Sequence, residues 1–250
     1  MGRGGVVSLL VLIGLWAGVS PCLQAGEPPE PRVVCSNIAP FVFSEQGNYR
    51  GYAYELGQAV MQRLGYRGVV EVQPLARANR TVQSEANVIA LWVGRIPERE
   101  ATVHWIYPVV VDDFSVYTVK GHPVAATLEQ AKALKMLGAN IGAANAIAAQ
   151  RRGLERIELI TSDDANGRKL MAGRIDGWIA SRSAVNYFLR LHGLPDDTLV
   201  KGVKLSDYQA WVVASLPSDP AVRAAWQATL HQLELEGELS RLADRYRIQR

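Results

Sequence analysis

The sequence predicts a mixed α/β fold in which strands and helices alternate along the chain in two consecutive blocks. Short apolar runs typical of strands are interleaved with segments whose apolar residues recur every three to four positions, as on one face of a helix. The chain has 250 residues, which is enough for two lobes that each bury a core of their own. A glycine and a proline in the segment 121–123 interrupt the pattern and divide the two blocks.

The first block is expected to begin with a buried strand at 32–36. A helix at 52–64 follows, because apolar residues recur there at every fourth position and Gly65 stands where a helix usually ends. The block continues with strands at 69–73, 88–93 and 114–120, and with a helix at 77–84 between the first two of these. This order is that of a block rich in β-α-β units and predicts an α/β fold.

The second block repeats the alternation. We expect helices at 128–136, from Asn145, from 162–164 and at 183–192, strands at 140–143, 157–160, 176–180 and 210–214, and a helical tail at 219–247. The adjacent pairs Asp112-Asp113 and Asp163-Asp164 are interpreted as strand-end or helix-cap residues, because neighbouring side chains diverge and so do not share one acid–base site.

The N-terminus has the pattern of a secretory signal peptide. Arg3 gives a short positive region, residues 6–19 are almost wholly apolar, and Ala25 precedes a proline-rich stretch. The apolar run is shorter than the ~20 residues that a membrane-spanning helix needs. Cys22 raises the possibility of a lipid anchor, but Pro21 stands where that motif has a small residue. We therefore predict a signal peptide at 1–25 and a periplasmic mature protein.

Composition and motifs exclude several classes of function. The net charge is only +3, which gives no indication of a nucleic-acid partner. Two cysteines without a CxxC motif exclude a disulfide scaffold and a cysteine-rich zinc site. The four histidines (His104, His122, His192 and His231) are dispersed without ligand spacing, and no GxSxG, Walker A or GxGxxG motif occurs. These observations favour a binding protein without a metal or cofactor over an enzyme.

Several short stretches follow one another along the mature chain. They are Ala39-Pro40-Phe41-Val42-Phe43, Gly51-Tyr52-Ala53-Tyr54-Glu55-Leu56, Arg63-Leu64-Gly65-Tyr66, Arg95-Ile96-Pro97-Glu98-Arg99, His104-Trp105-Ile106-Tyr107-Pro108, Gly173-Arg174-Ile175-Asp176-Gly177 and Glu236-Gly237-Glu238-Leu239. In this order they resemble the periplasmic solute-binding proteins of family 3, the polar amino acid type of ABC transporters. The resemblance implies the two-lobed α/β periplasmic binding protein fold of type II, with a ligand cleft between the lobes. Lobe 1 is expected at 31–119 and 206–250, and lobe 2 at 120–205.

The resemblance also implies a set of ligand-binding residues in the first lobe. An arginine at the position of Arg99 holds the ligand's carboxylate in that family, a forked contact that lysine does not reproduce. The preceding threonine of the pattern is Ile96 here. Trp92 and Gly94 fall where a first-lobe strand enters the cleft, and Trp92 is open to two interpretations, a ring stacked on the ligand or a core residue. Arg77, at a predicted helix start, is open to two interpretations as well, a residue that points toward the same cleft or a surface arginine.

The second lobe departs from the family pattern. The aspartate that receives the ligand's ammonium is replaced by Ser181, which Arg182 follows, and Asn145 stands where the family has a glycine-threonine pair before a helix. Asn145 is expected to cap that helix, whose free N–H groups favour an anion. Ile38 replaces the aromatic residue that covers the ligand. Because an ammonium buried without a carboxylate is costly, these positions and three converging arginines predict an anionic ligand.

The predicted function is capture of a small carboxylate-bearing ligand, an amino acid or an organic anion, for an ABC permease of the inner membrane by hinge closure. We expect a monomer with no nucleic-acid partner. Two alternatives remain open. A cyclohexadienyl dehydratase-like enzyme requires a carboxylic acid in the cleft, for which Glu55 is the candidate. The third function is a ligand-sensing input to a membrane receptor.

Overall fold

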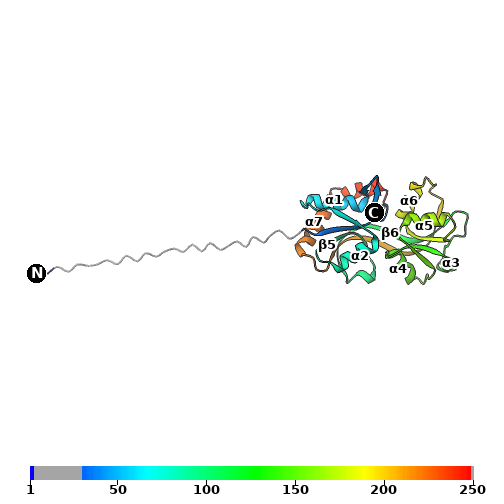
Figure 1. Ribbon diagram of the computed structural model, residues 1–250, viewed down its shortest axis with the longest axis horizontal. Helices are drawn as coiled ribbons and strands as arrows, with labels where there is room; N and C mark the ends of the chain where they lie inside the picture. Colours follow the sequence, from blue (N-terminus) through cyan, green and yellow to red (C-terminus); the bar gives the residue numbers. More distant parts are fainter. Residues whose placement is uncertain (3–29, 249–250) are drawn as a thin grey trace.

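The computed structural model describes residues 1–2 and 30–248 and has two α/β lobes that share one sheet (Figure 1). The sheet has eight strands in the order β4-β1-β5-β10-β6-β9-β7-β8. The predicted signal peptide and Cys22 lie outside the described residues, apart from Met1 and Gly2. Among the described residues, no helix is both long and apolar enough to cross a membrane.

Lobe 1 is built on three parallel strands whose order follows the first predicted block. Strands β1 (Arg32–Ser36), β4 (Val70–Gln73) and β5 (Val88–Gly94) are joined through helices α1 (Tyr52–Arg63) and α2 (Leu75–Ser84), and β1 pairs with both neighbours. Tyr52, Leu56 and Val60 are buried, as the predicted helical face requires. The structure adds a hairpin of β2 (Phe43–Glu45) and β3 (Asn48–Arg50), which was not predicted because three-residue exposed strands leave no apolar pattern.

Two long strands connect the lobes. β6 (Val103–Val119) and β10 (Leu199–Ser215) run antiparallel along their whole length. At one end β10 pairs with β5, at Ala210–Ala214, and at the other β6 pairs with β9 from Phe114 onward. The sequence predicted only 114–120 and 210–214, because register shifts along this pair interrupt the alternation of apolar and polar residues. The lobe boundaries at 119, 120, 205 and 206 remain predictions.

Lobe 2 carries the remaining strands with helices on both faces. Its strands are β9 (Gly177–Ser181), β7 (Leu137–Asn140) and β8 (Ile157–Ile160), and its helices are α3 (Leu128–Ala133), α4 (Ala144–Arg151), α5 (Asp163–Met171) and α6 (Arg182–Leu191). The strand predicted at 140–143 lies instead at Leu137–Asn140, so the loop that follows β7 points toward lobe 1. That shift matters for the site, because Asn140 and Ala143 both reach the space between the lobes.

The C-terminal tail consists of two helices, where the sequence predicted a single helical segment. α7 (Pro220–Leu235) and α8 (Glu238–Tyr246) are separated at Gly237, whose φ of 75° lies in the left-handed region that glycine adopts readily. Trp226, Leu230 and Leu239 are fully buried in the same core cluster as the face of α1. The chain therefore ends on lobe 1, which it left along β6 (Figure 1).

Candidate functional site

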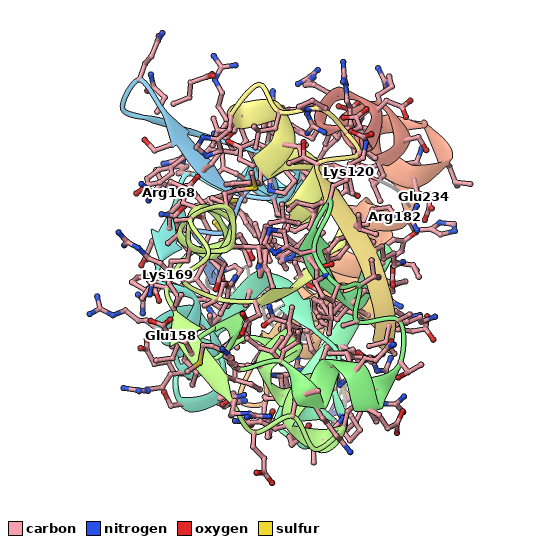
Figure 2. All side chains as sticks on the ribbon, turned by 90° about the vertical axis from the view of Figure 1, so that its right-hand side faces the viewer. Lys120, Glu158, Arg168, Lys169, Arg182 and Glu234 are labelled. Carbon is pink, nitrogen blue, oxygen red and sulfur yellow. The ribbon has the colours of Figure 1, made fainter. Side chains whose placement is uncertain are left out.

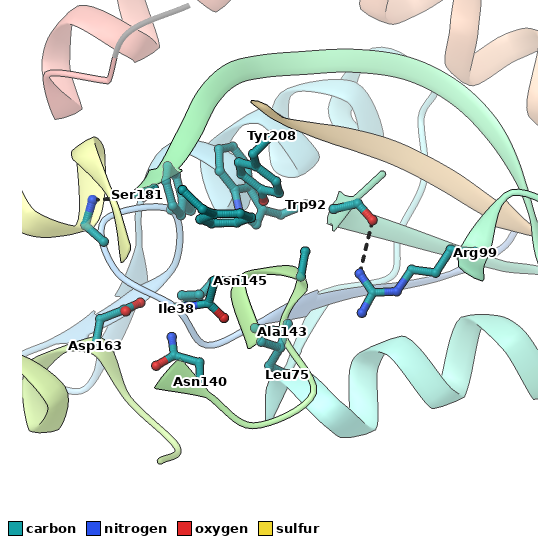
Figure 3. A pocket seen from close by; sticks show the side chains of 15 residues that line it. Ile38, Leu75, Trp92, Arg99, Asn140, Ala143, Asn145, Asp163, Ser181 and Tyr208 are labelled. Carbon is teal, nitrogen blue, oxygen red and sulfur yellow. Dashed lines mark hydrogen bonds between the residues drawn. The ribbon is translucent and has the colours of Figure 1, made fainter. Parts of the chain in front are cut away.

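A cavity lies between the lobes, where the long strands cross. Both lobes contribute to its wall, which Figure 3 shows from close by. The lining residues are Ile38, Phe41, Leu75, Trp92, Gly94, Arg99, Phe114, Asn140, Ala143, Ala144, Asn145, Asp163, Ser181, Ala184 and Tyr208. Six of the residues predicted for the site are among them, namely Ile38, Trp92, Gly94, Arg99, Asn145 and Ser181.

Arg99 is the basic residue of the cavity wall. It ends the short 3-10 helix η1 (Pro97–Arg99) and is only 7% exposed. Its Nη1 donates to the carbonyl of Gly94 at 3.0 Å, and its Nη2 donates across the cleft to the carbonyl of Gly142 in lobe 2 at 3.0 Å. Burial lowers the pKa of this guanidinium, and no carboxylate of the described residues forms an ion pair with it. A buried cation whose only partners are carbonyl oxygens is strongly stabilised when an anion binds beside it.

Aromatic rings form one side of the cavity. The Trp92 ring stacks on Phe41 with centroids 3.5 Å apart and planes 21° from parallel, and Tyr208 packs against Phe114 at 4.4 Å. Trp92 has a φ of 66°, a left-handed backbone that is rare for a bulky residue and persists only where the surroundings enforce it. Trp92 therefore meets both interpretations given by the sequence: it is 3% exposed within the core, and its ring also borders the cavity.

At Gly94, the end of β5 lies close to α4 of lobe 2. A Cβ atom at this position would lie 2.8 Å from the Tyr208 ring and 3.0 Å from the Cβ of Ala144 in lobe 2. It would also lie 3.5 Å from Nη1 of Arg99. A glycine is thus needed for the end of β5 to approach α4 this closely.

The second-lobe residues named by the sequence use their polar atoms within the protein. The prediction that Asn145 caps α4 is wrong. The N-cap residue is Ala143, and no side chain forms a capping hydrogen bond there. The Asn145 amide instead donates to the carbonyl of Ile179 at 2.8 Å and so attaches α4 to β9. The Ser181 hydroxyl accepts from the Ala184 N–H at 3.2 Å and caps α6.

Two of the three predicted arginines lie away from the cavity wall. Arg77 and Arg182 are exposed and do not line the cavity. Figure 2, which views the end of lobe 2, has Arg182 on the side of the molecule opposite Arg168 and Lys169. The expected convergence of three arginines is not found, and Arg99 alone of the three borders the cavity.

Asp163 is the charged residue of the cavity wall that sequence reasoning missed. It is the first residue of α5, whose N-cap is Ser162, so the predicted cap role falls on its neighbour. Burial raises the pKa of the Asp163 carboxyl to about 6, and the polar groups of Asn140 and Trp178 offset part of this rise. No ion pair of the described residues includes Asp163. The cavity wall therefore has an acidic residue at a position other than Ser181, where the family pattern has its aspartate.

Two further contacts hold the lobes together around the cavity. The Asn79 amide of α2 donates to the carbonyl of Gly142 at 3.2 Å, the same carbonyl that receives Arg99. Next to Arg99, Glu98 accepts from Nε of Arg151 of α4 at 2.7 Å, and this bond lowers the pKa of Glu98. Arg99, which faces the cavity, and Glu98, which forms an ion pair with lobe 2, are thus adjacent in the chain.

An open groove of about 1420 Å³ forms the mouth of the cavity. The two spaces share five lining residues, Ile38, Leu75, Asn140, Asp163 and Ala184. Asp163 borders both spaces, so its carboxyl stands at the junction, whereas Arg99 borders only the inner one.

Glu55, the candidate acid of the enzyme alternative, does not border the cavity. It lies on α1, where its carboxylate accepts from Arg245 at 2.6 Å and from the Tyr246 hydroxyl. Among the described residues, no group of three or more histidines, cysteines or acidic residues is placed to hold a metal ion.

Two α/β lobes joined by crossing strands, with a cavity between them, define the periplasmic binding protein fold of type II. The chain belongs to the bacterial extracellular solute-binding proteins, family 3, whose model matches residues 32–249. No curated protein sequence matches the chain.

Solved structures of the same fold come from proteins with different roles. A substrate-binding protein of an ABC uptake transporter from Streptococcus pneumoniae with bound histidine has a TM-score of 0.76 at 16% identity, covering 87% of this chain and 92% of that one. A histidine kinase sensor domain has a TM-score of 0.74 at 19% identity and coverages of 87% and 96%. The ancestral amino acid-binding protein AncCDT-1, a precursor of cyclohexadienyl dehydratase, has a TM-score of 0.74 at 18% identity and coverages of 86% and 94%. At these identities the likeness concerns the fold.

Proposed function

We propose that this solute-binding protein captures a small carboxylate-bearing ligand in the periplasm and delivers it to an ABC importer. The observation that carries the proposal is the buried guanidinium of Arg99, which has no counter-ion within the described residues and faces a cavity between two lobes. A carboxylate there accepts two parallel N–H bonds and neutralises the buried charge.

Hinge closure is the proposed mechanism. Arg99 reaches from η1 in lobe 1 to the Gly142 carbonyl in lobe 2, so a ligand held by Arg99 lies at the contact between the lobes. A ligand that bridges both lobes stabilises the closed arrangement relative to the open one, by its difference in affinity for the two. The permease of the inner membrane then recognises the closed monomer.

The proposal is tested by ligand screening of the signal-free protein. Thermal shift and calorimetry are run with amino acids, mono- and dicarboxylates and aromatic acids, since a ligand at 100 times its dissociation constant adds about 2.7 kcal/mol of stability. We expect hits that carry a carboxylate and that vanish in Arg99→Ala, whereas Arg77→Ala, an exposed arginine outside the cavity wall, keeps them. Hits without a carboxylate, or hits that survive Arg99→Ala, contradict the proposal.

One observation favours a second candidate, a dehydratase-like enzyme. The cavity contains a carboxyl, Asp163, whose pKa of about 6 suits proton transfer near neutral pH, a role for which Glu55 is badly placed. Incubation with prephenate and arogenate, followed by detection of the aromatic product, tests it. Product formation that is lost in Asp163→Asn would favour the enzyme. A sensory role uses the same closed state, and neighbouring permease or sensor genes distinguish it from transport.

A further inference from the structure

The two charged residues of the cavity wall face each other from different lobes. Of the fifteen lining residues, Arg99 is the only basic one and Asp163 is the only acidic one. Figure 3 shows them at opposite sides of the group, with Asn140 and Ala143 between them in the view. The two side chains therefore stand at opposite sides of the cavity and are not neighbours in direct contact.

We propose that Asp163 is a specificity-determining residue that receives a cationic group of the ligand, and that the ligand carries its carboxylate and its cation at opposite ends, as an ω-amino carboxylate does. The inference rests on the proposed function for the carboxylate end, which Arg99 holds.

Among the described residues, Asp163 has neutral hydrogen-bonding neighbours but no cationic partner for its charge. Its neighbour Asp164 is already paired with Arg168 of the same helix at 2.9 Å and with His192, the C-cap of α6, at 2.6 Å. From the strands packed against α5, the groups that face Asp163 are the neutral Asn140 and Trp178. Burial disfavours the ionised form of this carboxyl, and a cation beside it would stabilise that form. An ammonium group on the ligand supplies this cation.

The middle of the cavity suits a hydrocarbon spacer better than a polar one. Ile38, Leu75, Ala143 and Ala144 line it with apolar side chains. The two amides that also reach it are committed elsewhere: the Asn140 oxygen accepts from Asn166 at 2.7 Å, and the Asn145 amide donates to Ile179. Methylene groups between the two charged ends bury apolar area without leaving a polar group unpaired.

An α-amino acid does not satisfy the same pair of residues. Its ammonium and carboxylate are attached to one carbon, so a carboxylate on Arg99 keeps the ammonium on the Arg99 side. The described lining residues include no second carboxylate, and the Ser181 hydroxyl, which already accepts the Ala184 N–H, carries no charge. The cavity therefore offers an ammonium a carboxylate partner only at Asp163, across the width of the site.

The test is calorimetry of the signal-free protein with three series of probes. These are ω-amino carboxylates (β-alanine, γ-aminobutyrate and δ-aminovalerate), the straight-chain carboxylates of the same lengths, and the α-amino acids of the same lengths. We expect at least one ω-amino carboxylate to bind about tenfold or more tightly than the matching plain carboxylate and the matching α-amino acid.

The variants separate this inference from the proposed function. Asp163→Asn should bring the ratio between ω-amino and plain carboxylate to about one and leave the plain carboxylate bound, while Arg99→Ala should lose both. Asp164→Asn, next to the site but paired with Arg168 and His192, is the matched control and should keep the ratio. Melting curves of each variant check that it folds.

Three results would overturn the inference. They are an unchanged ratio in Asp163→Asn, equal loss in Asp164→Asn, or tighter binding of the α-amino series. If no carboxylate of any series binds, the proposed function itself fails and this inference fails with it. If carboxylates bind through Arg99 and the ratio does not depend on Asp163, only the inference fails.

Discussion

Replacing Gly94 with alanine is expected to weaken ligand binding by holding the lobes apart. The added methyl group would lie 3.0 Å from the Cβ of Ala144 across the cleft and 2.8 Å from the Tyr208 ring. Both values are below ordinary van der Waals contact, and neither neighbour is a long flexible chain that can swing away. Because Gly94 does not have a positive φ, the change adds bulk without backbone strain.

The magnitude follows from the cost of overpacking. An extra methylene in a well-packed site costs about 1–3 kcal/mol. The contact with Ala144 exists only when the lobes are closed, so its share of the cost falls on closure and lowers affinity by about 5–150-fold. The contact with Tyr208 is present whether the lobes are open or closed, so its share appears as a lower melting temperature of the ligand-free protein.

Calorimetry measures the affinity, and small-angle scattering of the ligand-free protein measures the compactness. We expect Gly94→Ala to weaken every ligand by the same factor and to enlarge the radius of gyration. Gly68→Ala is the control, since its methyl group meets its nearest neighbour at an ordinary 3.6 Å. Undiminished affinity in Gly94→Ala, or an equal loss in Gly68→Ala, would refute the view that this wall sets the closed state.

Three more predictions concern the charged groups around the cavity. Arg99→Lys should still lose about 1–3 kcal/mol of binding to carboxylates, since one ammonium cannot reproduce the forked contact; calorimetry showing unchanged affinity would contradict this. A double-mutant cycle of Glu98→Gln and Arg151→Gln should give a coupling energy of roughly 0.2–1 kcal/mol in ligand affinity. The coupling should shrink at high salt because the pair is partly exposed. A coupling energy of zero would show that this ion pair does not contribute to closure. Burial raises the pKa of Asp163 from 3.8 to about 6, so folding disfavours its ionised form and this contribution to stability is lost as pH rises from about 4 through 6. Between pH 4 and 6, the unfolding free energy of Asp163→Asn should therefore rise by roughly 2–3 kcal/mol relative to that of the wild type. If the two proteins show parallel pH profiles of stability, the pKa of Asp163 is not raised.

The sequence predicted the lobes and most elements because their signals are local. The face of α1 repeats at helical spacing, and the strand at Ile157–Ile160 is an apolar run bounded by turn residues, so both were located to within a residue or two. The length of β6 and β10 was not predictable in this way. Their pairing is fixed by contacts between distant parts of the chain, and the irregular register removes the alternation that a local pattern depends on.

The site was predicted unevenly for the same reason. Arg99 follows a short motif whose geometry is local, since η1 begins at Pro97 and its turn directs the side chain. Asp163 carried a visible signal, an acidic pair at a helix start, but the same pair is typical of a helix cap. Whether its carboxyl faces solvent or a cavity depends on where the N-terminus of α5 stands relative to lobe 1, and no local pattern records that.

The distribution of charge between the lobes links ligand choice to closure. Lobe 1 brings a guanidinium to the cavity and lobe 2 brings a carboxyl, and no pair in the described part of the chain joins them. Closure without a ligand buries the guanidinium and half-buries the carboxyl, and only carbonyl oxygens and neutral groups compensate the two charges. A ligand that carries the complementary charges at matching ends removes both penalties in the closed state alone, which is the differential affinity that closure requires. A ligand with one charged end removes only one penalty, so it should close the protein less completely, and scattering curves at saturation with a plain carboxylate and with its ω-amino counterpart would measure the difference.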